Sequence, residues 1–125
     1  MRIGILMMIV ASLGTTGSAS QPFSKSLAEC ATLYELFAVT PQAEARGEEF
    51  QFHLITVIDS YWAKADDWAS REGVPNRKAY FDAIKAESYP RWDAQLGNPL
   101  KLQDTKDWID YCRAFGKDQR LVLIY

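Results

Sequence analysis

The sequence has few of the side chains that catalytic and cofactor sites most often need. It has one histidine, His53, and two cysteines, and it contains neither a Cys-x-x-Cys-His motif for attached haem nor a glycine-rich phosphate loop. One histidine cannot build a multi-histidine metal site, and no Gly-x-Ser-x-Gly motif presents a serine nucleophile. We therefore expect no catalytic residues, no metal site and no cofactor.

A strong excess of charge of either sign is also lacking. The formal net charge is −2, and Arg2 is the single charged residue among the first twenty, so residues 21–125 carry −2 − 1 = −3. Proteins that bind nucleic acid or anionic lipid through charge usually display a basic patch. We expect neither a nucleic-acid partner nor a stable membrane anchor.

The longest hydrophobic run stands at the beginning of the chain. Residues 3–11 are apolar and uncharged, but this run is shorter than the roughly 20 residues that span a bilayer. Small residues follow it from Gly14 to Ser20, as at a signal-peptidase site. We predict that residues 1–20 are a cleaved signal peptide and that residues 21–125 form one exported domain, periplasmic or secreted.

The two cysteines, Cys30 and Cys112, suit an exported chain because an even number can pair in an oxidising compartment. We predict a disulfide between them, with two buried free thiols as the alternative. A lipid-attachment site at Cys30 is disfavoured, because Glu29 stands where that motif needs a small residue.

The spacing of apolar residues, together with capping and helix-breaking residues, predicts four helices. They cover about residues 24–39, 41–70, 75–96 and 104–116. Ser26 and Glu29 have capping-box spacing for the first helix, and Thr40 can cap the second. Gly47 is a weak point in the second helix, and residues 50–58 also have a composition that suits a strand. The longer helical spacing favours an all-α chain, a single four-helix bundle-like domain.

The third and fourth helices are marked by prolines and glycines. Pro75 can open the third helix, and Pro90 should kink or split it. Asp104 is expected to cap the fourth helix, and Asp107 in its first turn suits the helix dipole. Gly116 is expected to stop this helix. One apolar face on the fourth helix predicts a set of core residues: Trp108, Ile109, Cys112 and Phe115.

The chain ends on five apolar residues, 121–125, without a helical pattern. They can dock over the bundle as an extended strap, since an exposed apolar pentamer would promote aggregation. The alternative is a partner-binding segment, in which Leu121, Leu123 and Tyr125 are the candidate contacts.

The four tryptophans offer the other candidate site. Trp62 lies at helical spacing from Asp59 and Asp66, and Trp92 follows Pro90. An indole flanked by carboxylates can hold a cation, so these residues are candidate ligand contacts, although packing in an aromatic core is the favoured explanation.

Taken together, these patterns favour a small exported helical binding protein without catalytic activity. It would act through a protein partner as an inhibitor, an immunity factor or an assembly accessory. The runner-up is a small-ligand or metal-sequestering module that uses the bundle interior. An enzyme built from scattered carboxylates is the third candidate, and no family resemblance supports any of the three.

Overall fold

The computed structural model describes residues 21–124, so the predicted signal peptide and Tyr125 lie outside the described part. The elements in chain order are α1 (Phe23–Ala38), α2 (Pro41–Glu44), α3 (Glu48–Arg71), α4 (Arg77–Leu96), the 3₁₀ turn η3 (Pro99–Lys101) and α5 (Leu102–Asp118). No strand occurs within residues 21–124, which confirms the all-helical prediction and rules out the strand alternative for residues 50–58.

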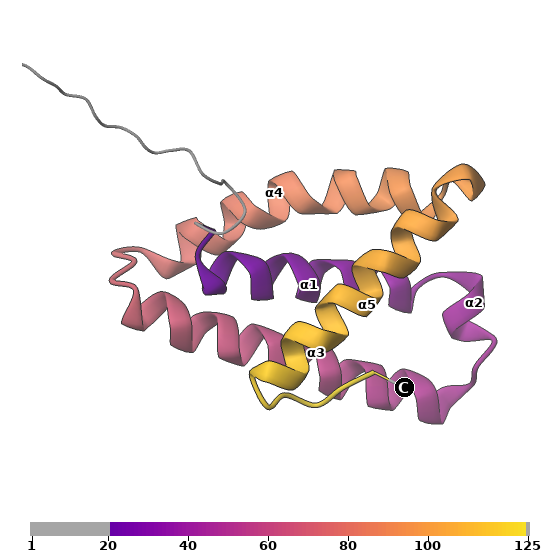
Figure 1. The fold of residues 1–125 in the computed structure, drawn as a ribbon, viewed down its shortest axis with the longest axis horizontal. Helices are drawn as coiled ribbons and strands as arrows, with labels where there is room; N and C mark the ends of the chain where they lie inside the picture. The colour runs from indigo at the N-terminus through magenta and orange to yellow at the C-terminus, as the bar shows by residue number, and fades with distance from the viewer. Residues whose placement is uncertain (1–20, 125) are drawn as a thin grey trace, which may run out of the picture.

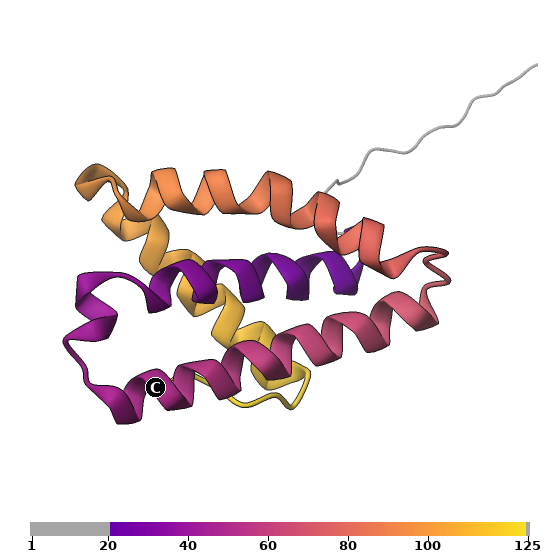
Figure 2. The ribbon, with the colours of Figure 1, turned by 180° about the vertical axis from the view of Figure 1, so that it is seen from behind.

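Three long helices lie side by side, and α5 crosses them. Figures 1 and 2 show α1 between α3 and α4, with α5 running obliquely over one face of this layer. The central helix α1 packs most extensively against α3 and then against α4. Its small and apolar residues allow this burial on several sides, and Leu27, Ala31 and Tyr34 are fully buried.

The start of α1 differs from the predicted capping box. The helix begins at Phe23, so Ser26 lies inside its first turn. The Ser26 hydroxyl instead accepts a hydrogen bond from Nε2 of Gln21 at 2.9 Å. Two residues earlier, the Ser24 hydroxyl donates to Glu72 at the end of α3. Glu72 also accepts from the backbone nitrogen of Ser24 at 3.3 Å, so a distant residue satisfies an N–H group of the first turn that a local cap would otherwise serve.

The predicted second helix is divided at the expected weak point. Thr40 caps α2 as predicted, since its Oγ1 accepts from the backbone nitrogen of Ala43 at 3.2 Å. Gly47 then adopts a φ of 94°, a left-handed conformation that glycine tolerates and a helix interior does not. The chain restarts as α3 at Glu48 and continues to Arg71.

The boundaries of α4 follow an asparagine cap rather than a proline. Pro75 does not open the helix, because the side chain of Asn76 accepts from the backbone nitrogen of Ala79 at 3.1 Å and fixes the start at Arg77. The helix is not split at Pro90 and runs on to Leu96.

Helix α5 is longer at both ends than the sequence predicted. The preceding 3₁₀ turn is capped by Asn98, so α5 begins at Leu102 and Asp104 lies in its first turn rather than at the cap. Gly116 does not stop the helix. It is buried inside it, and a Cβ atom there would lie 2.1 Å from the Tyr61 hydroxyl. The glycine therefore allows α5 to approach α3 closely.

The predicted disulfide joins Cys30 of α1 to Cys112 of α5, with 5.6 Å between their Cα atoms. Both cysteines are buried. The bond fastens the oblique helix to the centre of the layer, and it closes a loop with a sequence separation of 82 residues. In the chain-entropy treatment a loop of this length contributes about 4–5 kcal/mol to stability.

Residues 121–124 run back along the domain as an irregular strap. Ile124 is buried, and its backbone oxygen accepts from Nε of Arg113 at 2.9 Å. Nε2 of His53 lies 2.7 Å from the backbone oxygen of Leu123. The described part of the apolar tail is therefore docked on the domain, as expected for a strap.

Candidate functional site

A cleft of about 500 Å³ lies where α5 passes over α1 and α4, and we call it the crossing cleft. Its volume falls within the range of roughly 300–1,000 Å³ that is usual for small-molecule sites. Residues before and in α1 form one side: Gln21, Ser26, Glu29 and Cys30. Helix α4 contributes Trp92 and Gln95, and the opposite wall belongs to α5: Asp104, Asp107, Trp108, Tyr111 and Cys112.

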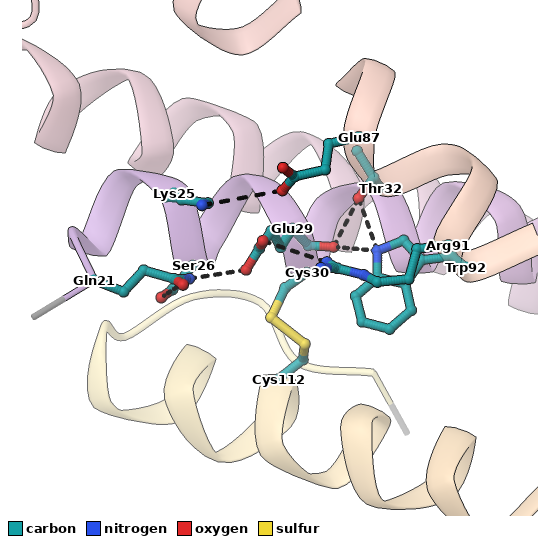
Figure 3. A network of polar contacts seen from close by, with 10 residues as sticks. All are labelled: Gln21, Lys25, Ser26, Glu29, Cys30, Thr32, Glu87, Arg91, Trp92 and Cys112. Carbon is teal, nitrogen blue, oxygen red and sulfur yellow. Dashed lines mark hydrogen bonds and ion pairs between the residues drawn. A yellow bond between two sulfur atoms is a disulfide. The ribbon is translucent and has the colours of Figure 1, made fainter. Parts of the chain in front are cut away.

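The α1 side of the cleft is a polar network around the buried carboxylate of Glu29. Figure 3 shows this network beside the disulfide. One carboxylate oxygen accepts from Nε2 of Gln21 at 2.8 Å, and the other lies 3.3 Å from Nη2 of Arg91. A buried charge is tolerated when it is paired and hydrogen-bonded in this way. Glu29 is thus an ion-paired structural group on this side of the cleft.

Trp92 is fixed against this network. Its side chain is 1% exposed, and its Nε1 donates to the Glu29 backbone oxygen at 3.1 Å and to the Thr32 hydroxyl at 3.0 Å. The guanidinium carbon of Arg91 lies 4.5 Å from the centroid of the indole. Trp92 is the one predicted ligand residue that lines the crossing cleft, and its polar atom is already engaged.

The α5 wall is more open and carries aromatic rings and carboxylates on one helical face. Asp104, Asp107, Trp108 and Tyr111 follow the spacing i, i+3, i+4 and i+7. Trp108 is 39% exposed and Tyr111 is 47% exposed. The two rings contact each other edge to face, and Trp108 also packs edge to face on Trp92. The prediction that Trp108 is a core residue is therefore wrong. Helix α5 crosses the layer at an angle and leaves part of its apolar face open.

Neither carboxylate of this wall is in an ion pair within residues 21–124. Asp107 accepts a hydrogen bond from Nε2 of Gln103 at 2.9 Å, and Asp104 is exposed in the first turn of the helix. Nearby, Nε2 of Gln95 is buried and has no acceptor among the described residues. The cleft thus combines exposed rings with carboxylates that no cation of the described chain neutralises.

The sequence assigned Asp104 and Asp107 to capping and to the helix dipole, and it did not single out Tyr111. The signal that identifies the wall was nevertheless present, as two carboxylates followed by two aromatic residues at helical spacing from Asp104 to Tyr111. It was hidden because the crossing angle of α5, which decides which part of the face stays open, is a tertiary property.

Trp62 lies in a different environment, between α1, α3 and α4. Its Nε1 donates to Oε2 of Glu35 at 3.0 Å, and the Lys85 ammonium lies 4.9 Å from its ring centroid. The Tyr89 hydroxyl donates to the other oxygen of Glu35. Burial first, and then this hydrogen bond, raise the pKa of Tyr89 above its ordinary value of 10.0. Trp62 therefore belongs to a group of polar contacts that joins α1, α3 and α4.

The remaining predicted ligand residues do not line the crossing cleft. Asp66 forms an ion pair with Arg77 at 2.7 Å on the surface, and Asp59 is exposed on α3. The structure therefore does not gather Asp59, Trp62 and Asp66 with Trp92 into one site.

The predicted partner-binding residues of the tail are partly covered. Leu121 packs against the core, and Leu123 is partly buried beside the position of Gly116. Tyr125 lies outside the described residues. Leu121 and Leu123 thus offer a partner only part of their apolar surface.

Residues 21–124 contain neither a grouped set of metal ligands nor a helix that could cross a membrane. Within residues 21–124, no group of three or more histidine, cysteine, aspartate or glutamate side chains is arranged to hold a metal ion. Over the same residues, no helix combines the length and the apolar character needed to cross a membrane. Comparison of the chain with protein-family models, with curated proteins and with solved structures found no match in any of the three.

Proposed function

We propose that this chain is an exported, non-catalytic binding protein that recognises a protein partner through the crossing cleft. Cleavage of the signal peptide at residues 1–20 would release residues 21–125 as a four-helix bundle-like domain. The disulfide supports export, because such bonds persist mainly in oxidising compartments. An inhibitor, an immunity factor or an assembly accessory acts by binding alone and fits this description.

The observation that carries the proposal is the pair of exposed rings at the mouth of the cleft, Trp108 and Tyr111. Tryptophan and tyrosine dominate binding energy in protein interfaces, where they fill pockets on the partner or line pockets for it. The disulfide holds this wall against α1, so little ordering would be needed on binding.

The polar groups on the α1 side of the cleft are already engaged, which favours binding over chemistry on that side. Both sulfur atoms are joined to each other, and the Glu29 carboxylate is occupied by Arg91 and Gln21. A nucleophile or a general base needs a reactive group that is not already engaged.

A photo-crosslinking amino acid at position 111 tests the proposal. The protein should crosslink to one partner in extract from the envelope of its own source cell. The same amino acid at Thr56, an exposed position on α3 that does not line the cleft, serves as the matched control. Equal crosslinking from both positions, or none from position 111, contradicts the proposal. Intact-mass analysis of the exported protein tests removal of residues 1–20 independently.

A small ligand in the same cleft is the second candidate, and the cleft volume is what favours it. Native mass spectrometry of protein purified from its own source would reveal a retained compound. A retained compound that is seen with the wild type and lost in Trp108→Ala would support this alternative. A wild-type mass equal to that of the protein alone would count against it.

A further inference from the structure

We infer that the crossing cleft takes a positively charged group, an ammonium or a guanidinium carried on an apolar stem. The inference rests on the proposed function, in that it assumes the cleft to be the binding site, and it names the chemistry that the cleft selects. The same group can come from a lysine or arginine side chain of a partner or from a free organic cation.

The charges of the cleft lining have one sign. Its ionisable carboxyl side chains are Glu29, Asp104 and Asp107, and no lysine or arginine lines it. Arg91 balances Glu29, which leaves a formal charge of −2 on the α5 wall. The nearest lysine on that helix turn, Lys106, pairs with Asp110 at 3.0 Å instead. The cleft is therefore electrostatically complementary to a cation.

The aromatic rings add a second attraction for the same charge. The face of an indole or phenol ring is negative and attracts an ammonium or guanidinium within about 6 Å of its centroid. One lining residue already makes such a contact outside the cleft, because the guanidinium of Arg91, which does not line the cleft, lies 4.5 Å from the Trp92 centroid (Figure 3). Trp108 and Tyr111 present exposed rings next to Asp104 and Asp107, where an incoming cation would meet both kinds of group.

The apolar stem follows from the rest of the lining. The partly exposed rings of Trp108 and Tyr111 offer apolar surface, which the methylene groups of a lysine or a diamine can cover. A bare inorganic cation would leave this surface exposed to water.

Helix-dipole compensation explains the acidic residues only in part. Asp104 lies in the first turn of α5, where a carboxylate stabilises the positive helix end. This role does not account for the exposed rings of Trp108 and Tyr111 on the same face. It also predicts that replacing the carboxylates changes stability alone, whereas our inference predicts a change in cation binding.

Titration followed by the ¹H–¹⁵N signal of the Trp108 indole tests the inference. The probes are cadaverine and Nα-acetyl-lysine amide, with 1-pentanol and Nα-acetyl-norleucine amide as neutral probes of matched size. We expect both cations to shift the Trp108 signal saturably, more weakly at high salt, and the neutral probes to leave it unmoved. The loss of this signal in Trp108→Phe assigns it to Trp108.

The variant Asp104→Asn/Asp107→Asn should weaken cation binding about tenfold, from two lost partly exposed charge interactions. Asp110→Asn is the matched control, because Asp110 lies on the same helix outside the cleft, and it should change binding by less than about twofold. Circular dichroism of each variant separates a loss of binding from a loss of folding.

Neutral probes that bind as well as the cations, or an unchanged affinity in Asp104→Asn/Asp107→Asn, would overturn the inference. Tighter binding of acetyl-lysine amide than of cadaverine supports a protein side chain as the source, and the reverse order supports a free cation. Crosslinking at position 111 without any cation response would leave the partner proposal standing and defeat this inference alone. A cation response without crosslinking would defeat the partner proposal and keep the cleft as a cation site.

Discussion

The close approach of α5 to α3 can be tested by adding one methyl group. In Gly116→Ala the new Cβ atom would lie 2.1 Å from the Tyr61 hydroxyl oxygen and 2.8 Å from the ring carbon that carries it. The hydroxyl cannot move freely, because it donates to the backbone oxygen of Cys112 at 2.6 Å. We therefore expect Tyr61 to be displaced and this buried hydrogen bond to be lost.

The size of the effect follows from three contributions. Overpacking a buried contact costs about 1–3 kcal/mol, and losing the hydrogen bond costs about 1 kcal/mol. Replacing a glycine inside a helix by alanine regains about 1 kcal/mol of helix propensity. Gly116→Ala should therefore lower the free energy of unfolding by about 1–3 kcal/mol. In the background of Tyr61→Phe the 2.1 Å contact no longer exists, so the same change should cost about 1 kcal/mol less.

Urea unfolding of the oxidised protein, followed by far-ultraviolet circular dichroism, measures all four members of this cycle. Gly97→Ala is the comparison, because its Cβ would come no closer than 3.3 Å to the backbone oxygen of Asp93. A neutral or stabilising Gly116→Ala, or an equal cost with and without the Tyr61 hydroxyl, would refute the close approach.

Three further predictions concern the disulfide, a buried tyrosine and the strap. Replacing Cys30 and Cys112 together by alanine should lower the free energy of unfolding by about 4–5 kcal/mol in urea titrations, because the bond closes a long loop. Burial raises the pKa of Tyr34 above its ordinary 10.0, so the folded state keeps a proton that the unfolded state loses. The contribution of Tyr34 to the free energy of unfolding is therefore fully present below about pH 10 and decreases above it. In Tyr34→Phe the urea midpoint should depend less on pH than in the wild type, between about pH 8 and about pH 11. Ile124→Ala should lower the free energy of unfolding by about 2–4 kcal/mol, measured by thermal or urea unfolding, because it leaves a cavity where the strap's buried side chain packs on the domain.

Each of these three has a clear contrary result. A double alanine variant of the cysteines with nearly unchanged stability would mean that the loop closure contributes little. An alkaline loss of stability that persists unchanged in Tyr34→Phe would assign the loss to other groups. Wild-type stability in Ile124→Ala would mean that the strap is not held by its buried side chain.

Local signals located most of the helices. The Thr40 cap, the weak point at Gly47 and the apolar spacing from Phe50 to Trp68 each depend on neighbouring residues, and the structure confirms all of them. The pairing of Cys30 with Cys112 was also predictable, because two cysteines behind a predicted signal peptide allow one intramolecular bond.

The errors arose where a distant partner decides the outcome. Gly116 resembled a helix stop, but its role is to make room for Tyr61, which lies 55 positions earlier in the chain. Trp108 resembled a core residue, but the oblique path of α5 leaves it at the mouth of a cleft. Trp62 was matched to carboxylates on its own helix, and its partner is Glu35 on another.

The sulfur–sulfur bond lies between the two walls of the crossing cleft, so the proposed binding would depend on oxidation of the cysteines. A newly made chain whose cysteines are still thiols lacks the covalent tether that keeps the α5 wall beside α1. Such a chain would present Trp108 and Tyr111 without a facing wall and would hold a guest weakly. Maturation of the bond would then switch on capture, and a strong reductant applied to the finished protein should release whatever the cleft holds.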